Sequence, residues 1–370
     1  MRLVRSPNVV AYWRGSRFCL EEFVRRSRIT AAPLVVELLA EFGKPKSSRS
    51  VARCFLTYTP ASVEREIGRL AQLGFLVPAT DRAARRDVAA EWKGSFPAAH
   101  FHFAARDVSY MTDPAKRVRH FRRRLAEEPQ PALYKSYPGR PRLPLSDPPS
   151  VVDGVSLKSA LERRRTVRDF SRQLVPFLDF ASVIRRTWGQ TGWTDAGMLG
   201  KLITKTSPSA GARHPIECYV LIWGVEGLPA GLYHYNVRES CLERLRGGDL
   251  REEAVRLAAG QGWVRGAAFL CVMTAVADRL FWKYTSDDSY RLFFLDAGHL
   301  AQTFALLAAA RGLGAFTTAS MKESRIEQLL GLDGVREFPV YLCGAGMARR
   351  GRHDSHTPPR TATGVRARTS

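Results

Sequence analysis

The chain has 370 residues, of which 45% are hydrophobic and 25% are charged. This composition is typical of a globular protein with room for two or three domains of roughly 100 to 200 residues each, and it excludes a disordered tail protein, a collagen-like repeat and a small disulfide-stapled scaffold. The formal net charge of +22 favours polyanionic partners such as nucleic acid, an acidic protein or a phosphorylated cofactor.

The first 110 residues predict a winged-helix-like domain. Residues 9–13 and 17–23 have the pattern of a short strand pair. Apolar residues at helical spacing follow between 34 and 55, and the clearest helix runs from Pro60 to a stop at Gly74. Such a unit serves equally for binding DNA and for clamping a peptide or a protein.

A basic and proline-rich linker is predicted for residues 111–150. Six basic residues lie between 116 and 124, a run that is more often a solvated helix face than a binding site. Seven prolines lie between 129 and 149, where their fixed φ and missing N–H exclude a regular helix or a central strand. We therefore expect a linker or an arm that wraps a surface.

Residues 151–350 predict a mixed α and β domain. The pattern indicates helices over 157–165 and 291–311, buried strands over 217–223, 267–275 and 339–343, and a hairpin over 231–245. Residues 351–370 contain few apolar side chains and predict a mobile basic tail.

The spacing of the cysteines and the length of the apolar runs indicate where in the cell the protein is expected to lie. The six cysteines are at least 23 positions apart, so no CxxC pair exists, and we expect buried free thiols and no metal site. The longest apolar stretch, 267–277, is shorter than the roughly 20 residues of a bilayer helix. The N-terminal residues also lack the apolar region of a signal peptide. We therefore expect a cytoplasmic protein without a membrane segment.

Three clusters in the second half offer groups that suit a phosphorylated or planar ligand. The segment ERRRTVRDF, at 162–170, carries guanidinium groups and a hydroxyl that suit a phosphate. SPSAGARHPIECYV, at 207–220, and RGLGAFTTAS, at 311–320, contain small residues that let backbone N–H groups approach a ligand closely. Each segment alone also fits a solvated turn or a helix cap.

A fourth cluster, at 281–302, reads FWKYTSDDSYRLFFLDAGHLAQ. Lys283 and Tyr284 are adjacent, and such a pair is more often incidental surface than catalytic. Asp296 and His299 stand one helical turn apart and fit a simple side-chain pair. Spacing alone leaves both the catalytic and the structural interpretation open.

Taken in order, the segments RRTVRDF, SPSAGARHP, GLYHY, KY followed by YRLFFLDAGHLAQ, and GLGAFTTAS resemble the SagB-type (ThcOx-like) peptide dehydrogenases of the FMN-dependent nitroreductase superfamily. The resemblance covers 157–347. It implies an α+β, nitroreductase-like FMN-binding fold, with a central mostly antiparallel sheet flanked by helices, behind a winged-helix-like N-terminal domain. It also implies a homodimer with FMN in the interface.

The resemblance assigns roles to residues. It implies that the FMN phosphate and ribityl chain are held by Arg164, Arg165, Thr166 and Arg168, that Ser209, Ala210 and Gly211 line the ribityl chain and ring edge, that Thr317, Thr318 and Ala319 supply backbone contacts to the flavin, and that Arg349 is a further phosphate contact. Thr166 stands where serine is usual and keeps the hydroxyl. Lys283 and Tyr284 occupy the catalytic Lys-Tyr motif, and the lysine must be desolvated or near cations to be neutral.

The expected activity is oxidation of thiazoline or oxazoline rings to thiazoles or oxazoles on a biosynthetic peptide, with FMN as cofactor and a cyclodehydratase as a partner. One alternative keeps this chemistry on a ring carried by a carrier protein, because carrier proteins are usually acidic. A second is a plain NAD(P)H-dependent nitro or quinone reductase. A third, a DNA-binding regulator, is disfavoured because helix 60–74 is nearly neutral, so nucleic acid is not the expected partner.

Overall fold

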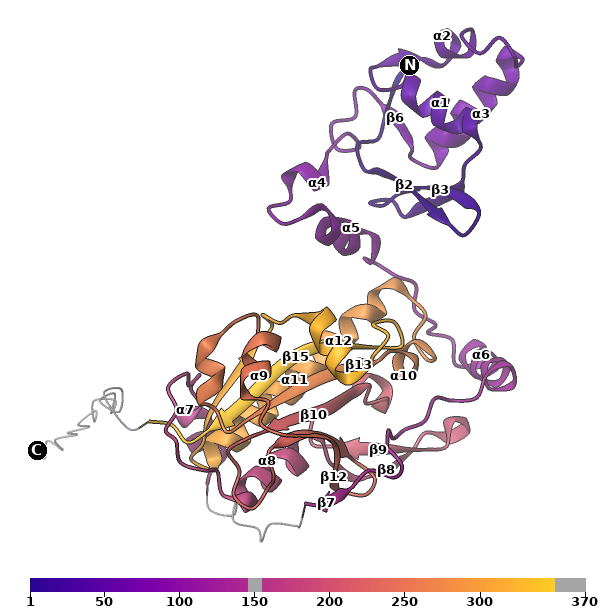
Figure 1. The fold of residues 1–370 in the computed structure, drawn as a ribbon. Helices are drawn as coiled ribbons and strands as arrows, with labels where there is room; N and C mark the ends of the chain where they lie inside the picture. Colours follow the sequence, from indigo (N-terminus) through magenta and orange to yellow (C-terminus); the bar gives the residue numbers. More distant parts are fainter. Residues whose placement is uncertain (146–154, 350–370) are drawn as a thin grey trace, which may run out of the picture. The chain divides into compact units, whose positions relative to one another are not determined.

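The computed structural model describes residues 1–145 and 155–349, and the predicted mobile tail lies outside these residues. The chain divides into two compact units, the first formed essentially by Met1–Tyr110 and the second beginning at Met111 (Figure 1). The two units are described separately below.

The first unit contains two three-stranded antiparallel sheets and five helices. Its elements are β1 (Arg2–Arg5), β2 (Val9–Arg14), β3 (Arg17–Glu22), β4 (Ser27–Thr30), α1 (Pro33–Glu41), β5 (Lys46–Ser47), α2 (Ser48–Ala52), α3 (Pro60–Gln72), β6 (Leu76–Pro78), α4 (Val88–Glu91) and α5 (Phe96–Ala104). One sheet has the order β5-β1-β6 and the other β2-β3-β4. The predicted strand pair is therefore present, with β4 added at its edge.

Helix α3 forms where the sequence predicts it. The Thr59 side chain accepts a hydrogen bond from the backbone N–H of Ser62, and Pro60 occupies the first turn, where its missing N–H has no cost. Val63, Ile67 and Leu70 form the buried face. Helices α1, α2 and α3, together with the pairing of strands β6 and β1, form the winged-helix-like arrangement that the sequence predicts.

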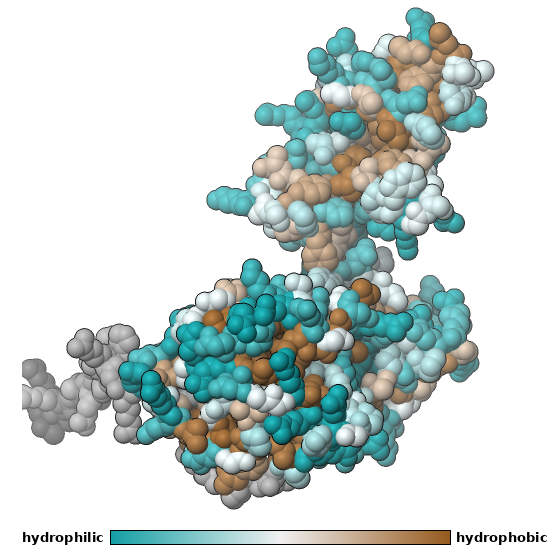
Figure 2. Space-filling model, viewed as in Figure 1, coloured by the Kyte–Doolittle hydropathy of each residue, from teal (hydrophilic) through white to brown (hydrophobic). Residues whose placement is uncertain are grey.

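The linker is more structured than its prolines predict. Helix α6 (Pro114–Glu127) carries the basic run; it has no buried residue, and its surface is mostly hydrophilic (Figure 2). Strand β7 (Arg142–Pro144) then pairs antiparallel with β12 (Cys241–Gly247). No strand was predicted here, but β7 lies at the edge of the sheet, where a proline that lacks an N–H is tolerated, so the predicted exclusion of a central strand still holds.

The second unit is built on a seven-stranded sheet in the order β14-β15-β13-β10-β11-β12-β7, with every neighbouring pair antiparallel. Its remaining elements are α7 (Leu157–Arg163), α8 (Phe177–Trp188), β8 (Gln190–Asp195), β9 (Lys201–Lys205), β10 (Ile216–Ile222), β11 (Gly231–Asn236), α9 (Arg251–Leu257), β13 (Phe269–Val276), α10 (Ala277–Phe281), α11 (Tyr290–Ala310), β14 (Gly314–Thr318), α12 (Glu323–Leu330) and β15 (Glu337–Gly346). The predicted α+β fold with a central antiparallel sheet is confirmed.

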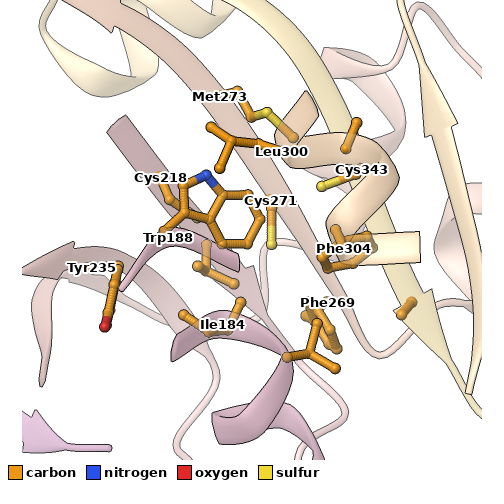
Figure 3. Packing of buried hydrophobic residues seen from close by; sticks show 14 of the residues in the cluster. Ile184, Trp188, Cys218, Tyr235, Phe269, Cys271, Met273, Leu300, Phe304 and Cys343 are labelled. Carbon is orange, nitrogen blue, oxygen red and sulfur yellow. The ribbon is translucent and has the colours of Figure 1, made fainter. Parts of the chain in front are cut away.

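Alternate residues of β10 divide between two hydrophobic clusters, as expected when side chains point to opposite faces of a strand. Cys218 and Val220 pack with residues of α8 and α11, including Trp188 and Phe304 (Figure 3). Tyr219 and Leu221 pack with residues of α9 and α12 on the other face. The sheet is thus covered by helices on both faces.

Helix α11 is more apolar over a longer stretch than expected from the sequence. Residues Asp287–Ala310 contain an 18-residue window with a mean hydropathy of 1.4, so this helix is long and apolar enough to cross a membrane by length and composition. The core helix of a soluble protein meets the same test, and α11 packs Phe293, Leu300 and Phe304 into the main cluster beneath the sheet. Hydropathy along this helix is therefore explained by burial against the sheet.

Candidate functional site

A cavity of about 140 Å³ lies between the end of α7, helix α11 and strand β14. It is lined by Arg164, Arg165, Thr166, Gly298, Ala301, Gln302, Ala305, Ala315, Phe316, Thr317 and Tyr341. The arginine segment is fixed against β14, because the N–H of Val167 donates to the carbonyl of Ala315 at 2.8 Å. The segment 311–320, predicted as a loop, forms β14 because its small residues pair with β15.

Small side chains on α11 leave room at this cavity. Gly298, Ala301 and Ala305 follow one face of the helix, and a Cβ at Gly298 would meet no atom within 4 Å. The opposite wall carries the guanidinium groups of Arg164 and Arg165 and the hydroxyl of Thr166. A cationic end beside a shallow wall of small residues suits a ligand with a phosphate and a flat ring.

Arg168 and Arg349 line a second, larger groove of about 770 Å³. The Arg168 guanidinium lies over the ring of Trp263, at 5.4 Å from its centroid. Arg349 forms an exposed ion pair of 3.2 Å with Asp169. The phosphate-binding set implied by the resemblance is thus divided in this structure, with Arg164, Arg165 and Thr166 at one cavity and the other two arginines at another.

The β14 residues also differ in their surroundings. Thr317 lines the cavity and accepts a hydrogen bond of 3.1 Å from the hydroxyl of Tyr341. Thr318 instead accepts one from the Gln261 side chain at 3.1 Å, and neither Thr318 nor Ala319 lines the cavity.

Lys283 and Tyr284 meet the loop that contains Gly211. The Lys283 ammonium lies 3.5 Å from the carbonyl oxygen of Gly211. A Cβ built at Gly211 would lie 2.5 Å from both Lys283 Nζ and the Tyr284 hydroxyl, so both side chains press against this glycine. Gly211 has φ +59°, and Ala212 and His214 also have positive φ. Such strained backbone persists where the surroundings hold it, and it occurs often at functional sites.

The surroundings of the pair favour a neutral lysine. Burial lowers the pKa of Lys283, and the nearby charges of Arg213 and Arg117 lower it further. Burial raises the pKa of Tyr284, and Asp296 raises it further while Arg213 opposes the change. The requirement for desolvation and neighbouring cations, stated from the sequence, is met by these residues.

Asp296 anchors the strained loop to α11. Its carboxylate accepts hydrogen bonds from the Ser209 hydroxyl at 2.5 Å and from the Ala210 N–H at 3.3 Å. The Ser209 oxygen in turn accepts one from the backbone N–H of His214 at 2.9 Å. Burial raises the pKa of Asp296. The i, i+3 spacing from His299 does not explain the role of Asp296, because its hydrogen bonds are with a loop distant in sequence.

Arg213 is a buried cation that sequence reasoning left without a role. Its side chain donates to the carbonyl of Arg279 at 2.9 Å and to the side-chain oxygen of Gln130 at 3.0 Å, and it lies over the ring of Trp282. Nη2 has no hydrogen-bond partner, and within the described residues no carboxylate forms an ion pair with it. Burying an unpaired charge is costly, so the position calls for a compensating role. The only sequence signal was an arginine in a loop of small residues.

Two further titratable groups lie near the loop, a buried histidine and a partly buried lysine. Burial, together with Lys205 and Arg279, lowers the pKa of His214 to about 3, so this imidazole is neutral at physiological pH. Its Nε2 lies 3.1 Å from the carbonyl oxygen of Ile203. Burial also lowers the pKa of Lys205 to about 8.

A model of the nitroreductase family matches residues 161–347, half of the chain. This segment contains the cationic cavity, the Gly211 loop, helix α11 and the Lys283–Tyr284 pair. The chain belongs to the nitroreductase family. Membership indicates an oxidoreductase.

One relative matches more of the chain than the family model does, and a second matches about half of it. The chain is 25% identical over 325 residues to the trifolitoxin-processing protein TfxB of Rhizobium leguminosarum bv. trifolii, a match that covers 82% of this chain and 85% of that protein. It is 26% identical over 195 residues to a protein of Methanocaldococcus jannaschii named as a nitroreductase, covering 53% of this chain and 92% of the other.

A crystal structure of an Anabaena variabilis protein named as a nitroreductase has the same fold. It superposes with a TM-score of 0.53 at 22% sequence identity and covers 68% of this chain. The match spans 47% of the Anabaena chain, so less than half of that protein is represented here.

Proposed function

We propose that this nitroreductase-family protein is an FMN-dependent dehydrogenase that oxidises thiazoline or oxazoline rings to thiazoles or oxazoles on a biosynthetic peptide. The observation that carries the proposal is the Lys283–Tyr284 pair, pressed against Gly211 beside a buried cation. Asp296, which anchors that loop, is two residues from Gly298 of the cavity on the same helix. Helix α11 thus both lines the cavity and anchors the loop against which the pair lies.

The residues at the cavity fit FMN. Arg164, Arg165 and Thr166 would hold the phosphate, and the small residues of α11 would lie against the flat ring. When bound, FMN supplies an acceptor for a hydride. The further phosphate contacts implied for Arg168 and Arg349, and the ring-edge and backbone contacts implied for Ser209, Ala210, Gly211, Thr318 and Ala319, stay part of this proposal.

A homodimer is part of the proposal. The cavity, at about 140 Å³, is smaller than the roughly 300 Å³ of the smallest usual ligand pockets. Phe294 and Leu295 of α11 are 45% and 55% exposed near it, and a second copy that covers this helix would enclose the ligand.

The residues of this chain would handle the proton. Conversion of an azoline to an azole removes one ring hydrogen as a proton and a second as a hydride. The Lys283 amine, whose pKa is lowered by burial and by Arg213, would take the proton in its neutral form. The Tyr284 hydroxyl, which faces the same glycine, orients the ring or relays the proton to water. Asp296 holds the loop that positions both groups.

A peptide substrate is supported by the match to the trifolitoxin-processing protein, which covers most of both chains. A cyclodehydratase that supplies the azoline remains the proposed partner. A carrier-protein-bound azoline is the second candidate, favoured by the net charge of +22. A cytoplasmic location also remains proposed, and it is supported by cysteines that are free thiols and mostly buried.

Mass spectrometry of azoline-containing peptides incubated with the purified protein tests the proposal. We expect a loss of about 2 Da per oxidised ring with wild type. Lys283→Ala should retain FMN and lose at least about 100-fold in turnover, the usual contribution of a general base. Rapid reduction by NADPH with no change in azoline peptides would instead establish a nitro or quinone reductase.

A further inference from the structure

Helix α6 presents a row of cations with few partners. It carries seven basic or imidazole side chains, at Lys116, Arg117, Arg119, His120, Arg122, Arg123 and Arg124. Two exposed ion pairs use Arg123 and Arg124, which contact Glu127 and Glu128 at 3.6 and 2.7 Å. Within the described part of the chain, Lys116, Arg117, Arg119 and Arg122 form no ion pair, and all four are exposed.

The helix is held next to the Lys283–Tyr284 pair. The ring of Phe121 stacks on the ring of Trp282, with centroids 6.3 Å apart and planes at 20°. The Trp282 indole N–H donates to the carbonyl of Glu128, just beyond the helix, at 3.3 Å. Arg117 stands one turn before Phe121, and its charge reaches Lys283. Arg117 therefore lies near the pair, and the other exposed cations are on the same helix.

The position argues for a partner that also enters the site. A solvated helix face needs no particular location, whereas α6 is fixed by contacts to the residue preceding Lys283. A nucleic acid backbone binds exposed cations anywhere on a protein surface, so it does not require cations next to the pair. Two of the cations here are also already paired with glutamates at the end of the helix. A peptide with carboxylates close to its reacting ring fits both the charge and the place.

We propose that α6 is the docking surface for an acidic segment of the peptide substrate; this inference rests on the proposed function. The helix has 14 residues and is about 21 Å long. An extended peptide covers that length with about six residues. Lys116, Arg119 and Arg122 are three positions apart and share one stripe, where guanidinium and ammonium groups pair with Asp or Glu side chains. Because these pairs are exposed, salt weakens them.

Fluorescence anisotropy with the full-length protein tests the docking surface. The probes are a labelled peptide of six Glu and Asp residues and its Gln and Asn counterpart, both without an azoline. We expect only the acidic peptide to bind, with affinity that falls as salt rises. Replacing Lys116, Arg119 and Arg122 together by Glu should weaken binding at least roughly tenfold, the loss of three exposed pairs. The triple Gln variant should show a smaller loss.

The matched control reverses three exposed arginines of the first unit, Arg14→Glu, Arg53→Glu and Arg65→Glu, which changes the net charge equally. This control should keep most of the affinity. Equal losses in both triple variants, or a greater loss in the control, would overturn the proposal in favour of a general charge effect or a clamp in the first unit. Duplex DNA that competes with the peptide and binds more tightly would also overturn it.

Turnover separates this inference from the proposed function. With azoline peptides that carry the acidic segment, the α6 Glu variant should raise KM and leave kcat unchanged; with peptides that lack the segment it should change neither. Azoline oxidation with unchanged KM would refute the docking surface alone. Acidic-peptide binding without any azoline oxidation would refute the proposed function and leave docking intact.

Discussion

At the scale of single residues, the site depends on two positions that a list of reactive side chains omits. Arg213 is a buried cation without a carboxylate partner, and Gly211 is the surface against which Lys283 and Tyr284 lie. One sets the charge around the pair and the other sets its position. Each can be changed separately.

Replacing Arg213 should move the pH dependence of turnover. Lys283 must be neutral to take a proton, so kcat rises with pH through the pKa of this lysine. Arg213→Met removes a cation that lowers this pKa, so the rising limb should shift to higher pH, while burial, the larger cause, continues to lower the pKa. Arg213→Lys keeps the charge and should keep the limb in place. An unmoved limb in the Met variant would show that Arg213 is only structural.

Adding a methyl group at Gly211 should damage the site. A Cβ there would lie 2.5 Å from both functional groups of the pair, and φ is +59°. We expect Gly211→Ala to lose about 100-fold in kcat and about 1 kcal/mol in the free energy of unfolding. Gly227→Ala is the matched control, because Gly227 has φ +70° with no atom within 4 Å of the added carbon. It should lose similar stability and no activity; comparable activity in the two variants would contradict the account.

At the scale of elements, buried polar networks tie the arm and the strands together. The Lys135 ammonium pairs with Glu337 at the start of β15 and donates to the Tyr219 hydroxyl at 2.6 Å. Tyr219 and Thr274 donate to the other oxygen of Glu337, at 3.0 and 2.6 Å. The arm that leads from α6 to β7 is thus fixed to β10, β13 and β15.

Cutting this tie should destabilise the second unit. Lys135→Met leaves the Glu337 carboxylate mostly buried without its cation, and we expect a loss of about 2 kcal/mol in the free energy of unfolding in urea. Lys158→Met removes an exposed lysine 3.9 Å from Glu162 and should cost less than about 0.5 kcal/mol. Equal effects of the two substitutions would mean that the arm is not anchored by this pair.

A second network predicts acid sensitivity. Burial alone would raise the pKa of Glu217, but Arg279 at 2.5 Å and His234 at 2.9 Å hold it well below its usual range. A carboxyl with a depressed pKa stabilises the fold fully above its unfolded pKa of about 4.5 and loses this contribution as pH falls towards the folded value. Glu217→Gln should therefore unfold with less difference between pH 6 and pH 3 than wild type. A steeper pH dependence in the variant would contradict this assignment.

At the scale of the whole molecule, local patterns predicted the elements that rely on local rules. Helix α3 has its cap and proline, β10 and β13 are mostly apolar runs, and α11 has a helical apolar face. Strand β14 was missed because its small and hydroxylated residues resemble a loop, and only pairing with β15 makes it a strand. Strand β7 was missed because an edge position is a property of the sheet.

The site shows the same division. Lys283, Tyr284 and the arginine turn were found through motifs that resemble a known family. The roles of Arg213 and Asp296 depend on contacts with residues 66 and 87 positions away, which spacing does not reveal. The sequence therefore identified the candidate reacting groups, while the structure adds the residues that surround them.

The central claim is that Lys283 works beside a flavin to oxidise an azoline. Its most direct measurement is the anaerobic absorbance of the purified, FMN-loaded protein at about 450 nm, a band of the cofactor, after an azoline peptide is added. The account predicts bleaching in wild type and at least roughly 100-fold slower bleaching in Lys283→Ala with equal FMN content. An unchanged spectrum with azoline peptides, together with bleaching by NADPH, would contradict it.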